Sequence, residues 1–322
     1  MPLIEPSRFR PSWPWRNAHV QTVWPHVARL GRRVPYERER LELADGDFLD
    51  LDVATVGSTT AVVLLHGMES CSAAPYMMGM ARAATDAGLD AVAMNFRGCS
   101  GEPNRLVRSY HGGESGDVHS VLQHLLATRG YTRLALVGFS LGGNMMLNYL
   151  GDGQHALPPQ LRAAVGICVP MDLASCAERL DTGGLGFYGR RFIRLLVAKA
   201  VAKARRFPEA LDAAAFADVD SFAAFDDRYT APVHGFADAQ SYWRACSGLR
   251  LLERIATPTL VLNAEDDPLL VPSCFPRDRA RSLEHLYLEV PTHGGHVGFV
   301  AGAFGQTRWQ EARALSFLLD YL

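Results

Sequence analysis

The stretch that decides the fold is Leu134-Ala-Leu-Val-Gly-Phe-Ser-Leu-Gly-Gly-Asn144. Its first four residues are apolar without interruption, as in a strand that is buried on both faces of a sheet. A helical segment is predicted directly afterwards, from 142 to 150. Glycines at 138 and 142 permit a turn that is too tight for residues with a Cβ atom. The stretch therefore predicts a strand, a sharp turn and a helix, with Ser140 held at the turn.

Apolar runs of the same kind recur along the chain, and helical segments lie between them. The runs cover 61–65, 89–96, 134–137, 163–168 and 259–262, with a weaker one at 285–290, and the helical segments cover about 76–87, 115–129 and 142–150, with a last helix at 309–322. Unbroken apolar strands that alternate with helices are typical of a parallel sheet covered on both faces. Asp45-Gly46-Asp47, between two partly alternating runs, indicates a hairpin before them. The sequence predicts an α/β fold with a doubly wound, mostly parallel sheet.

Two segments fall outside this alternation of strands and helices. Residues 1–35 are rich in Pro and Trp and predict an N-terminal arm that packs on the core, since Pro disfavours a regular helix there. Residues 171–250 predict a helical insertion that covers the carboxyl edge of the sheet, where α/β folds bind their ligands. We therefore expect the core to comprise 36–170 and 251–322.

Size and composition exclude several classes of protein. The 322 residues are 48% hydrophobic and 20% charged, which is ordinary for a globular chain and excludes disorder, collagen and coiled coil. Because the chain has 32 basic and 34 acidic residues, the formal net charge is −2 and a nucleic-acid partner is not expected.

No apolar stretch approaches the roughly 18–20 residues of a membrane span, and the first residues lack a signal pattern. With six scattered cysteines, expected to be reduced, the sequence predicts a cytoplasmic protein.

The Gly-x-Ser-x-Gly pattern around Ser140 predicts a nucleophile elbow, because it lies between a buried strand and a helix. A serine hydroxyl is a weak nucleophile until a base removes its proton. In this architecture the acid and then the histidine follow the serine along the chain. His296 lies in a Gly-rich loop past the final strand and is the expected base. His293, three residues earlier on the same loop, is the alternative.

The acid that orients the imidazole is expected in Asn263-Ala-Glu-Asp-Asp-Pro268, just after a core strand. Counting from Ala264 favours Asp267, whereas counting from Asn263 points to Asp266. Asp172 follows the preceding strand and does not fit the topology. The two backbone donors for an oxyanion are expected to be the N–H groups of Leu141 and Met68. No metal or organic cofactor is expected, because no set of Cys, His and Asp ligands accompanies the two loop histidines.

Several motifs in one order make the chain resemble a known family. They are Asn17-Ala-His19-Val-Gln21-Thr22, His66-Gly67, Asn95-Phe-Arg97-Gly-Cys-Ser-Gly101, Tyr110-His111 with Asp117, Gly138 to Asn144, Phe225-Asp226, Ala231 to Phe236, Asn263 to Pro268 and Gly294 to Phe299. The chain resembles the α/β-hydrolases of the bacterial YheT type, their plant embryogenesis-associated relatives and the eukaryotic lipid esterases close to them. The resemblance implies an α/β-hydrolase fold and a serine carboxylesterase whose triad is Ser140, His296 and Asp267 or Asp266.

The expected function is hydrolysis of short- to medium-chain acyl esters through an acyl-enzyme, with a small-molecule ester as partner. The alternatives are acyl transfer to an alcohol acceptor and a non-catalytic binding protein that keeps the fold. Helices are predicted over 187–206 and 211–225 within the insertion, and the first is basic and amphipathic. A helix of that kind can lie weakly on an anionic membrane surface, although a solvated basic face is the commoner outcome.

Overall fold

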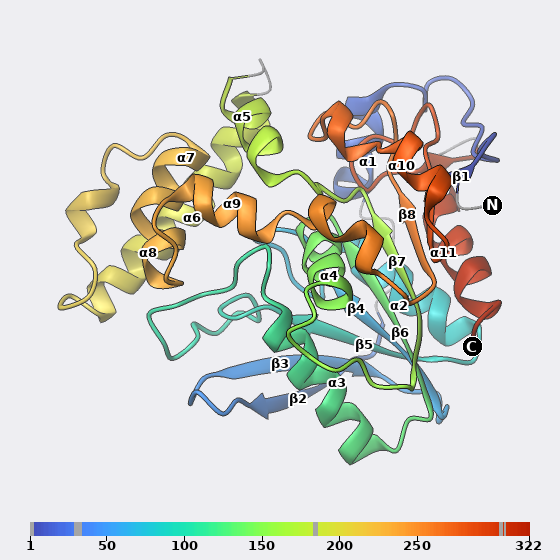
Figure 1. Ribbon diagram of the computed structural model, residues 1–322, viewed down its shortest axis with the longest axis horizontal. Coiled ribbons are helices and arrows are strands. Elements are labelled where there is room, and N and C mark those ends of the chain that lie inside the picture. Colours follow the sequence, from blue (N-terminus) through green and yellow to red (C-terminus); the bar gives the residue numbers. More distant parts are fainter. Residues whose placement is uncertain (1–2, 29–33, 183–185, 303–304, 306) are drawn as a thin grey trace.

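The computed structural model describes residues 3–28, 34–182, 186–302, 305 and 307–322. Within these ranges nine strands form one sheet in the order β1-β9-β8-β7-β6-β4-β5-β3-β2 (Figure 1). The strands are β1 (Leu3–Ile4), β2 (Glu37–Glu42), β3 (Phe48–Ala54), β4 (Thr60–Leu65), β5 (Asp90–Asn95), β6 (Arg133–Phe139), β7 (Leu161–Ile167), β8 (Thr259–Leu262) and β9 (Leu286–Glu289). A separate small pair is formed by β10 (Val300–Ala301) and β11 (Thr307–Arg308).

The sheet is parallel from β1 to β5 and antiparallel at the edge formed by β3 and β2. The antiparallel pair is the hairpin that Asp45-Gly46-Asp47 predicts, with Gly46 at φ +84° in the turn. The six apolar runs all form strands, at β4, β5, β6, β7, β8 and β9. The prediction of a mostly parallel, doubly wound sheet is therefore confirmed.

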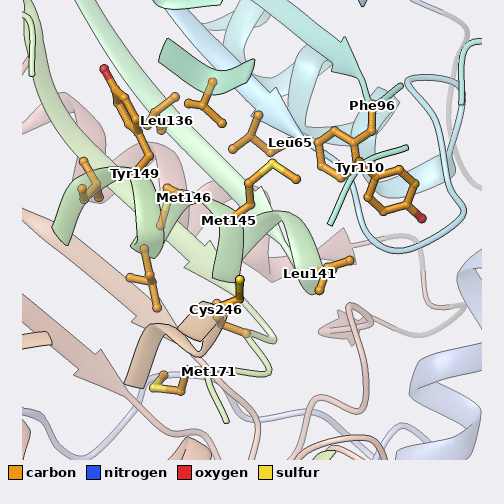
Figure 2. Packing of buried hydrophobic residues seen from close by; sticks show 14 of the residues in the cluster. Leu65, Phe96, Tyr110, Leu136, Leu141, Met145, Met146, Tyr149, Met171 and Cys246 are labelled. Carbon is orange, nitrogen blue, oxygen red and sulfur yellow. The ribbon is translucent and has the colours of Figure 1, made fainter. Parts of the chain in front are cut away.

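Helices cover both faces of the sheet. The helices of the core are α2 (Pro75–Asp86), α3 (Ser115–Arg129), α4 (Leu141–Gly151), α10 (Arg277–Ser282) and α11 (Trp309–Leu319). Alternate residues of β4 enter two separate apolar clusters, Val63 and Leu65 on the side of α3 and α4, Val62 and Leu64 on the side of α2 and α11. Figure 2 shows the first cluster, where Met145 and Tyr149 of α4 lie near Leu65 and Leu136 of the sheet. A central strand that packs against helices on both faces favours apolar residues at every position in its middle, which explains the unbroken apolar runs.

The segment between β7 and β8, called the insert below (171–250), is mostly helical and lies to one side of the sheet (Figure 1). It contains α5 (Leu173–Thr182), α6 (Gly186–Arg206), η1 (Ala213–Phe216), α7 (Phe222–Phe225), η2 (Asp226–Thr230), α8 (Ala231–Val233), α9 (Ala239–Cys246) and the start of η3 (Gly248–Arg254). The predicted helix over 211–225 is wrong as a single element. Asp212 and Ser221 each cap a short helix there, because their side chains accept backbone N–H groups and divide the segment.

The arm differs from expectation in one respect, because it contains a regular helix, α1 (Ala18–Val27). The Asn17 side chain accepts the N–H groups of His19 and Val20 and starts the helix. Pro25 is accommodated in its last turn. Ahead of α1, β1 pairs with β9 and Phe9 is buried against Phe299 and Trp309.

None of the helices in the described ranges combines the length and the apolarity that crossing a bilayer requires. The six cysteines are all free thiols, as expected.

Candidate active site

Ser140 lies in a strained turn between β6 and α4. Its backbone has φ +51° and ψ −123°, outside the usual regions for a residue with a side chain. A Cβ atom on Gly142 would lie 2.4 Å from the carbonyl oxygen of His66, and one on Gly138 would lie 2.6 Å from that of Gly142. The Ser140 N–H donates to the carbonyl of Ile167 at 2.8 Å, which anchors the turn to β7. The glycine spacing in the sequence is thus explained by close backbone contacts.

Three side chains that are far apart in the sequence form a chain of hydrogen bonds. The His296 Nε2 atom lies 2.9 Å from the Ser140 Oγ, and the His296 Nδ1 atom lies 2.8 Å from an Asp267 oxygen. The second Asp267 oxygen accepts the N–H of Leu269 at 2.8 Å. The Asp267 side chain is fully buried, whereas that of His296 is 12% exposed. The hydroxyl, imidazole and carboxylate are therefore hydrogen-bonded in the order in which an imidazole can act as a base while a carboxylate stabilises its positive charge.

The alternative residues Asp266 and His293, on the loops after β8 and β9, are more exposed than Asp267 and His296. Asp266 accepts the N–H of Gly295 at 2.9 Å and lies 3.3 Å from His293 Nδ1. Burial raises the pKa of Asp266, although these two contacts oppose the shift. Asp172 accepts the hydroxyls of Ser175 and Ser273. In the described residues Asp266 and His293 form a pair of their own, and neither makes a hydrogen bond to Ser140.

The loop between β9 and β10 (290–299), which carries His296 and is called the histidine loop below, rests on α1 of the arm. The His296 N–H donates to the Thr22 hydroxyl at 2.9 Å, and that hydroxyl donates to the Ala18 carbonyl at 2.7 Å. The fully buried Gln21 side chain accepts the Val300 N–H and donates to the Val300 carbonyl, at 2.6 and 3.0 Å. A Cβ atom on Gly298 would lie 2.3 Å from the Gln21 carbonyl. Sequence reasoning missed these supporting residues, although both belong to the Asn17–Thr22 motif.

Cys168, at the end of β7, is a second support for the histidine loop. Its sulfur accepts the N–H of Val297 at 3.1 Å, and burial raises the pKa of its thiol well above the usual value. The ligand atoms of Cys168, Asp267 and His296 lie within 4.8 Å of one another. Both nitrogens of His296 already face Asp267 and Ser140, and the Cys168 sulfur already accepts the Val297 N–H. These contacts fit a hydrogen-bonded support for the histidine loop better than a metal site.

Met68 and Leu141, the expected oxyanion donors, flank Ser140. Leu141 is the first residue of α4, and Met68 follows β4 in the loop that starts with His66. Among the described residues, no group accepts a hydrogen bond from the N–H of either. His66 holds the loop, because its Nε2 accepts the Phe96 N–H at 3.1 Å while Nδ1 lies 2.7 Å from the Gly67 carbonyl. Burial lowers the pKa of His66 to about 3, so the ring is neutral.

Glu69 follows Met68 in the loop after β4 and connects this loop to the insert. Its backbone has φ +50°, and its N–H donates to the Tyr110 hydroxyl at 2.8 Å. Its carboxylate accepts the Tyr110 hydroxyl at 2.7 Å and the Lys199 ammonium of α6 at 2.8 Å. Tyr110 therefore braces the loop. Arg97 and Asp117 instead form a buried ion pair with contacts of 2.6 and 2.8 Å.

A cavity of about 370 Å³ opens beside Ser140 and His296. Its walls come from α1, from the loop after β4 and from α6, and they include Thr22, Val23, Met68, Glu69, Phe187, Tyr188, Arg191, Phe192 and Leu195. A smaller cavity of about 70 Å³ shares Met68, Ser140 and His296. It lies between the core and the insert, and Asp226 and Trp243 are among its lining residues. The insert thus supplies a large part of the surface that faces Ser140.

Known proteins are similar to this chain in sequence or in fold. YheT of Escherichia coli (strain K12), for which the name proposes esterase activity, is 38% identical over 98% of this chain and 94% of its own. The phospholipase ABHD3 of Mus musculus is 26% identical over 94% of this chain and 75% of its own. The solved Pyrococcus furiosus esterase Pf2001 superposes with a TM-score of 0.58 at 16% identity, covering 91% of this chain and 97% of its own. The resemblance to the YheT group is confirmed.

The model of the α/β hydrolase fold family matches residues 60–303. This range runs from β4 through the insert and the histidine loop. The chain therefore belongs to the α/β hydrolase fold family, in the group that includes YheT.

Proposed function

We propose that the protein is a serine carboxylesterase that hydrolyses short- to medium-chain acyl esters through an acyl-enzyme. It is a carboxylic ester hydrolase by family, since its fold and its relatives named as esterase and phospholipase agree on that class. The observation that carries the finer proposal is the chain of two hydrogen bonds from Ser140 through His296 to Asp267, 2.9 and 2.8 Å long.

In the first half of the reaction His296 acts as the base. Its Nε2 atom takes the proton from Ser140 as the Oγ atom attacks the carbonyl carbon of the ester. Asp267 holds the other ring nitrogen protonated and stabilises the imidazolium that forms. The tetrahedral intermediate then collapses, the bond to the alcohol oxygen breaks, and His296 gives its proton to the leaving alcohol.

The negative charge of the intermediate needs fixed donors. The N–H groups of Met68 and Leu141 have no other acceptor in the described part of the chain, and both residues line the smaller cavity beside Ser140. The amino end of α4, which begins at Leu141, adds its positive dipole end. Loss of one donor of this kind typically costs about 10²–10³ in rate.

In the second half of the reaction water replaces the alcohol. His296 removes a proton from the water as it attacks the acyl carbon, and the proton returns to Ser140 when the acid leaves. Every step uses side chains and backbone groups of the protein, and no cofactor enters the mechanism.

The size of the cavity supports a substrate of modest length. Its volume of about 370 Å³ is near the lower end of the roughly 300–1,000 Å³ of small-ligand pockets. Phe192, Leu195 and Leu269 give it an apolar wall for the acyl chain. The experiment is a series of p-nitrophenyl esters from acetate to palmitate, with a fluorophosphonate probe for the nucleophile. We expect the best turnover between butyrate and octanoate, and labelling that Ser140→Ala abolishes.

Equal turnover by Ser140→Ala would contradict the mechanism, and failure of the probe to label the wild-type protein would favour a non-catalytic role. Added ethanol tests acyl transfer. An ethyl ester yield well above the share expected from the bulk ethanol-to-water ratio would favour the transferase instead.

A further inference from the structure

Exposed apolar side chains are concentrated around the mouth of the larger cavity. Eight large hydrophobic residues are exposed in the described chain, and five of them lie on α1 and α6. These five, called the apolar rim below, are Val20, Val23, Val27, Phe187 and Leu195, with Val27 67% and Phe187 70% exposed. Since a monomer scatters such side chains singly, a cluster at one site marks an interaction surface.

The rim is one surface, although its two helices are more than 150 residues apart in the chain. Val20, Val23 and Val27 follow the spacing i, i+3, i+7 and therefore share one face of α1. Val23 lines the cavity together with Phe187 and Leu195 of α6. His19 Nδ1 lies 3.1 Å from the Tyr188 hydroxyl, and the two rings stack with centroids 5.9 Å apart. The contact joins α1 to α6 at the mouth.

Unpaired positive charge borders the apolar rim. Arg190, Arg191 and Arg194 are exposed on α6, and no acidic side chain lies within salt-bridge distance of them in the described residues. Some arginines elsewhere on the surface do have such partners, for example Arg279 with Glu253 at 2.7 Å and Arg40 with Glu102 at 2.6 Å. Other exposed arginines, such as Arg162 and Arg244, also lack one in the described residues, so what distinguishes the three on α6 is their position beside the apolar rim. The three free guanidinium groups are complementary to an anionic surface.

We propose that the apolar rim and these arginines dock the protein on the surface of an anionic lipid aggregate, with the mouth of the cavity against the lipid. A second copy of the chain fits this surface less well, because a two-fold interface brings each patch against itself and would oppose three arginines with three. That the docked enzyme takes its ester from the lipid layer rests on the proposed function. The docking itself does not.

The test measures binding to vesicles of phosphatidylcholine, with and without phosphatidylglycerol, using the Ser140→Ala protein so that no lipid is consumed. We expect binding that requires the anionic lipid and weakens with salt. The double variant Arg190→Gln/Arg194→Gln should bind anionic vesicles about 30-fold more weakly, since each basic residue near such a surface is worth about fivefold. Val20→Ser/Val27→Ser should weaken binding by about tenfold or more at every salt concentration.

Two variants at other places serve as matched controls. Arg162→Gln removes an exposed arginine at the amino end of β7, whereas the site lies at the carboxyl end of the sheet. Leu319→Ser removes an apolar side chain that is 52% exposed on α11. Both should bind vesicles like the parent protein. Equal loss in the controls and in the rim variants would overturn the proposal, as would vesicle binding that ignores both lipid charge and salt.

Hydrolysis of soluble p-nitrophenyl acetate separates this proposal from the proposed function. When the same substitutions at Val20, Val27, Arg190 and Arg194 are made in the protein that keeps Ser140, this activity should be retained. Vesicle binding without any ester hydrolysis would leave docking intact and overturn the esterase, whereas hydrolysis without vesicle binding would do the reverse. Sedimentation that shows a dimer dissociated by Val20→Ser/Val27→Ser would assign the rim to a second copy and overturn lipid docking.

Discussion

The hydroxyl of Thr22 accepts a hydrogen bond from the backbone N–H of His296 at 2.9 Å, across 274 positions of the chain. Thr22, which lies on α1 outside the core, therefore helps to position the His296 imidazole relative to Ser140. Because Thr22 also donates to the Ala18 carbonyl, its own position is fixed by α1. The arm is thus part of the frame that holds the site.

Replacing Thr22 with Val should lower kcat about tenfold while KM changes little. The change keeps the shape of the side chain but leaves the His296 N–H without an acceptor, which costs about 1–3 kcal/mol for a buried group. Part of that cost should appear as a lower unfolding free energy, so both kinetics and denaturation are measured. Thr22→Ser keeps the hydroxyl and should stay close to the wild type, and an equal loss in both variants would contradict the role of the hydrogen bond.

Asp267→Asn and Asp266→Asn form a matched pair that tests which carboxylate serves His296. Asp267→Asn should lower kcat by about 10⁴, because an amide cannot hold the imidazole in the required tautomer or balance its charge. Asp266→Asn should change kcat by less than about tenfold, since an amide oxygen can still accept the Gly295 N–H. The measurement is kcat/KM on a soluble ester, and the reverse order of effects would reassign the acid.

Gly142→Ala should destabilise the protein by several kcal/mol or prevent it from folding. Its methyl group would meet the backbone of His66 and Leu65 at 2.4 and 2.6 Å, and backbone atoms cannot move aside cheaply. Gly116→Ala in α3 is the control, because its methyl group would meet nothing closer than 3.5 Å. A gain of about 0.5–1 kcal/mol is expected there. Thermal unfolding of both variants gives the comparison.

The buried Asp226, beside the smaller cavity, should make stability depend on pH. Burial raises its pKa from 3.8 to about 7, although Trp243 donates to it at 2.7 Å. The folded state therefore binds this proton more tightly than the unfolded state. The stabilisation that this proton provides is fully present below about pH 4 and is lost as pH rises through about 7.

Asp226→Asn should remove that contribution, so its stability relative to the wild type should be higher at pH 8 than at pH 5. The difference is expected to reach about 1–4 kcal/mol, since one pKa unit corresponds to about 1.4 kcal/mol. Urea unfolding at the two pH values measures it. An identical difference at both pH values would show that Asp226 does not change its protonation between them.

Much of the fold follows from local pattern. Strands such as β4 and β6 are predictable because both of their faces are buried and their central residues are all apolar. The turn at Ser140 is legible because only glycine fits beside it. The single helix predicted over 211–225 fails because Asp212 and Ser221 compete locally for backbone N–H groups. The helix α1 was missed because its cap, Asn17, outweighs the Pro25 near its end.

By itself the sequence determined the alternation of strands and helices in the core, the tight turn at Ser140 and the loop that carries His296, because each depends on neighbours along the chain. Only the tertiary structure brought Asp267 to His296 and directed Asp266 to His293 and Gly295. Only it placed Thr22 beneath the histidine loop and Val23 beside Phe187 at the cavity mouth. The physical reason is that adjacent residues in a turn point in different directions, and which direction meets a partner is decided by elements far away in the chain.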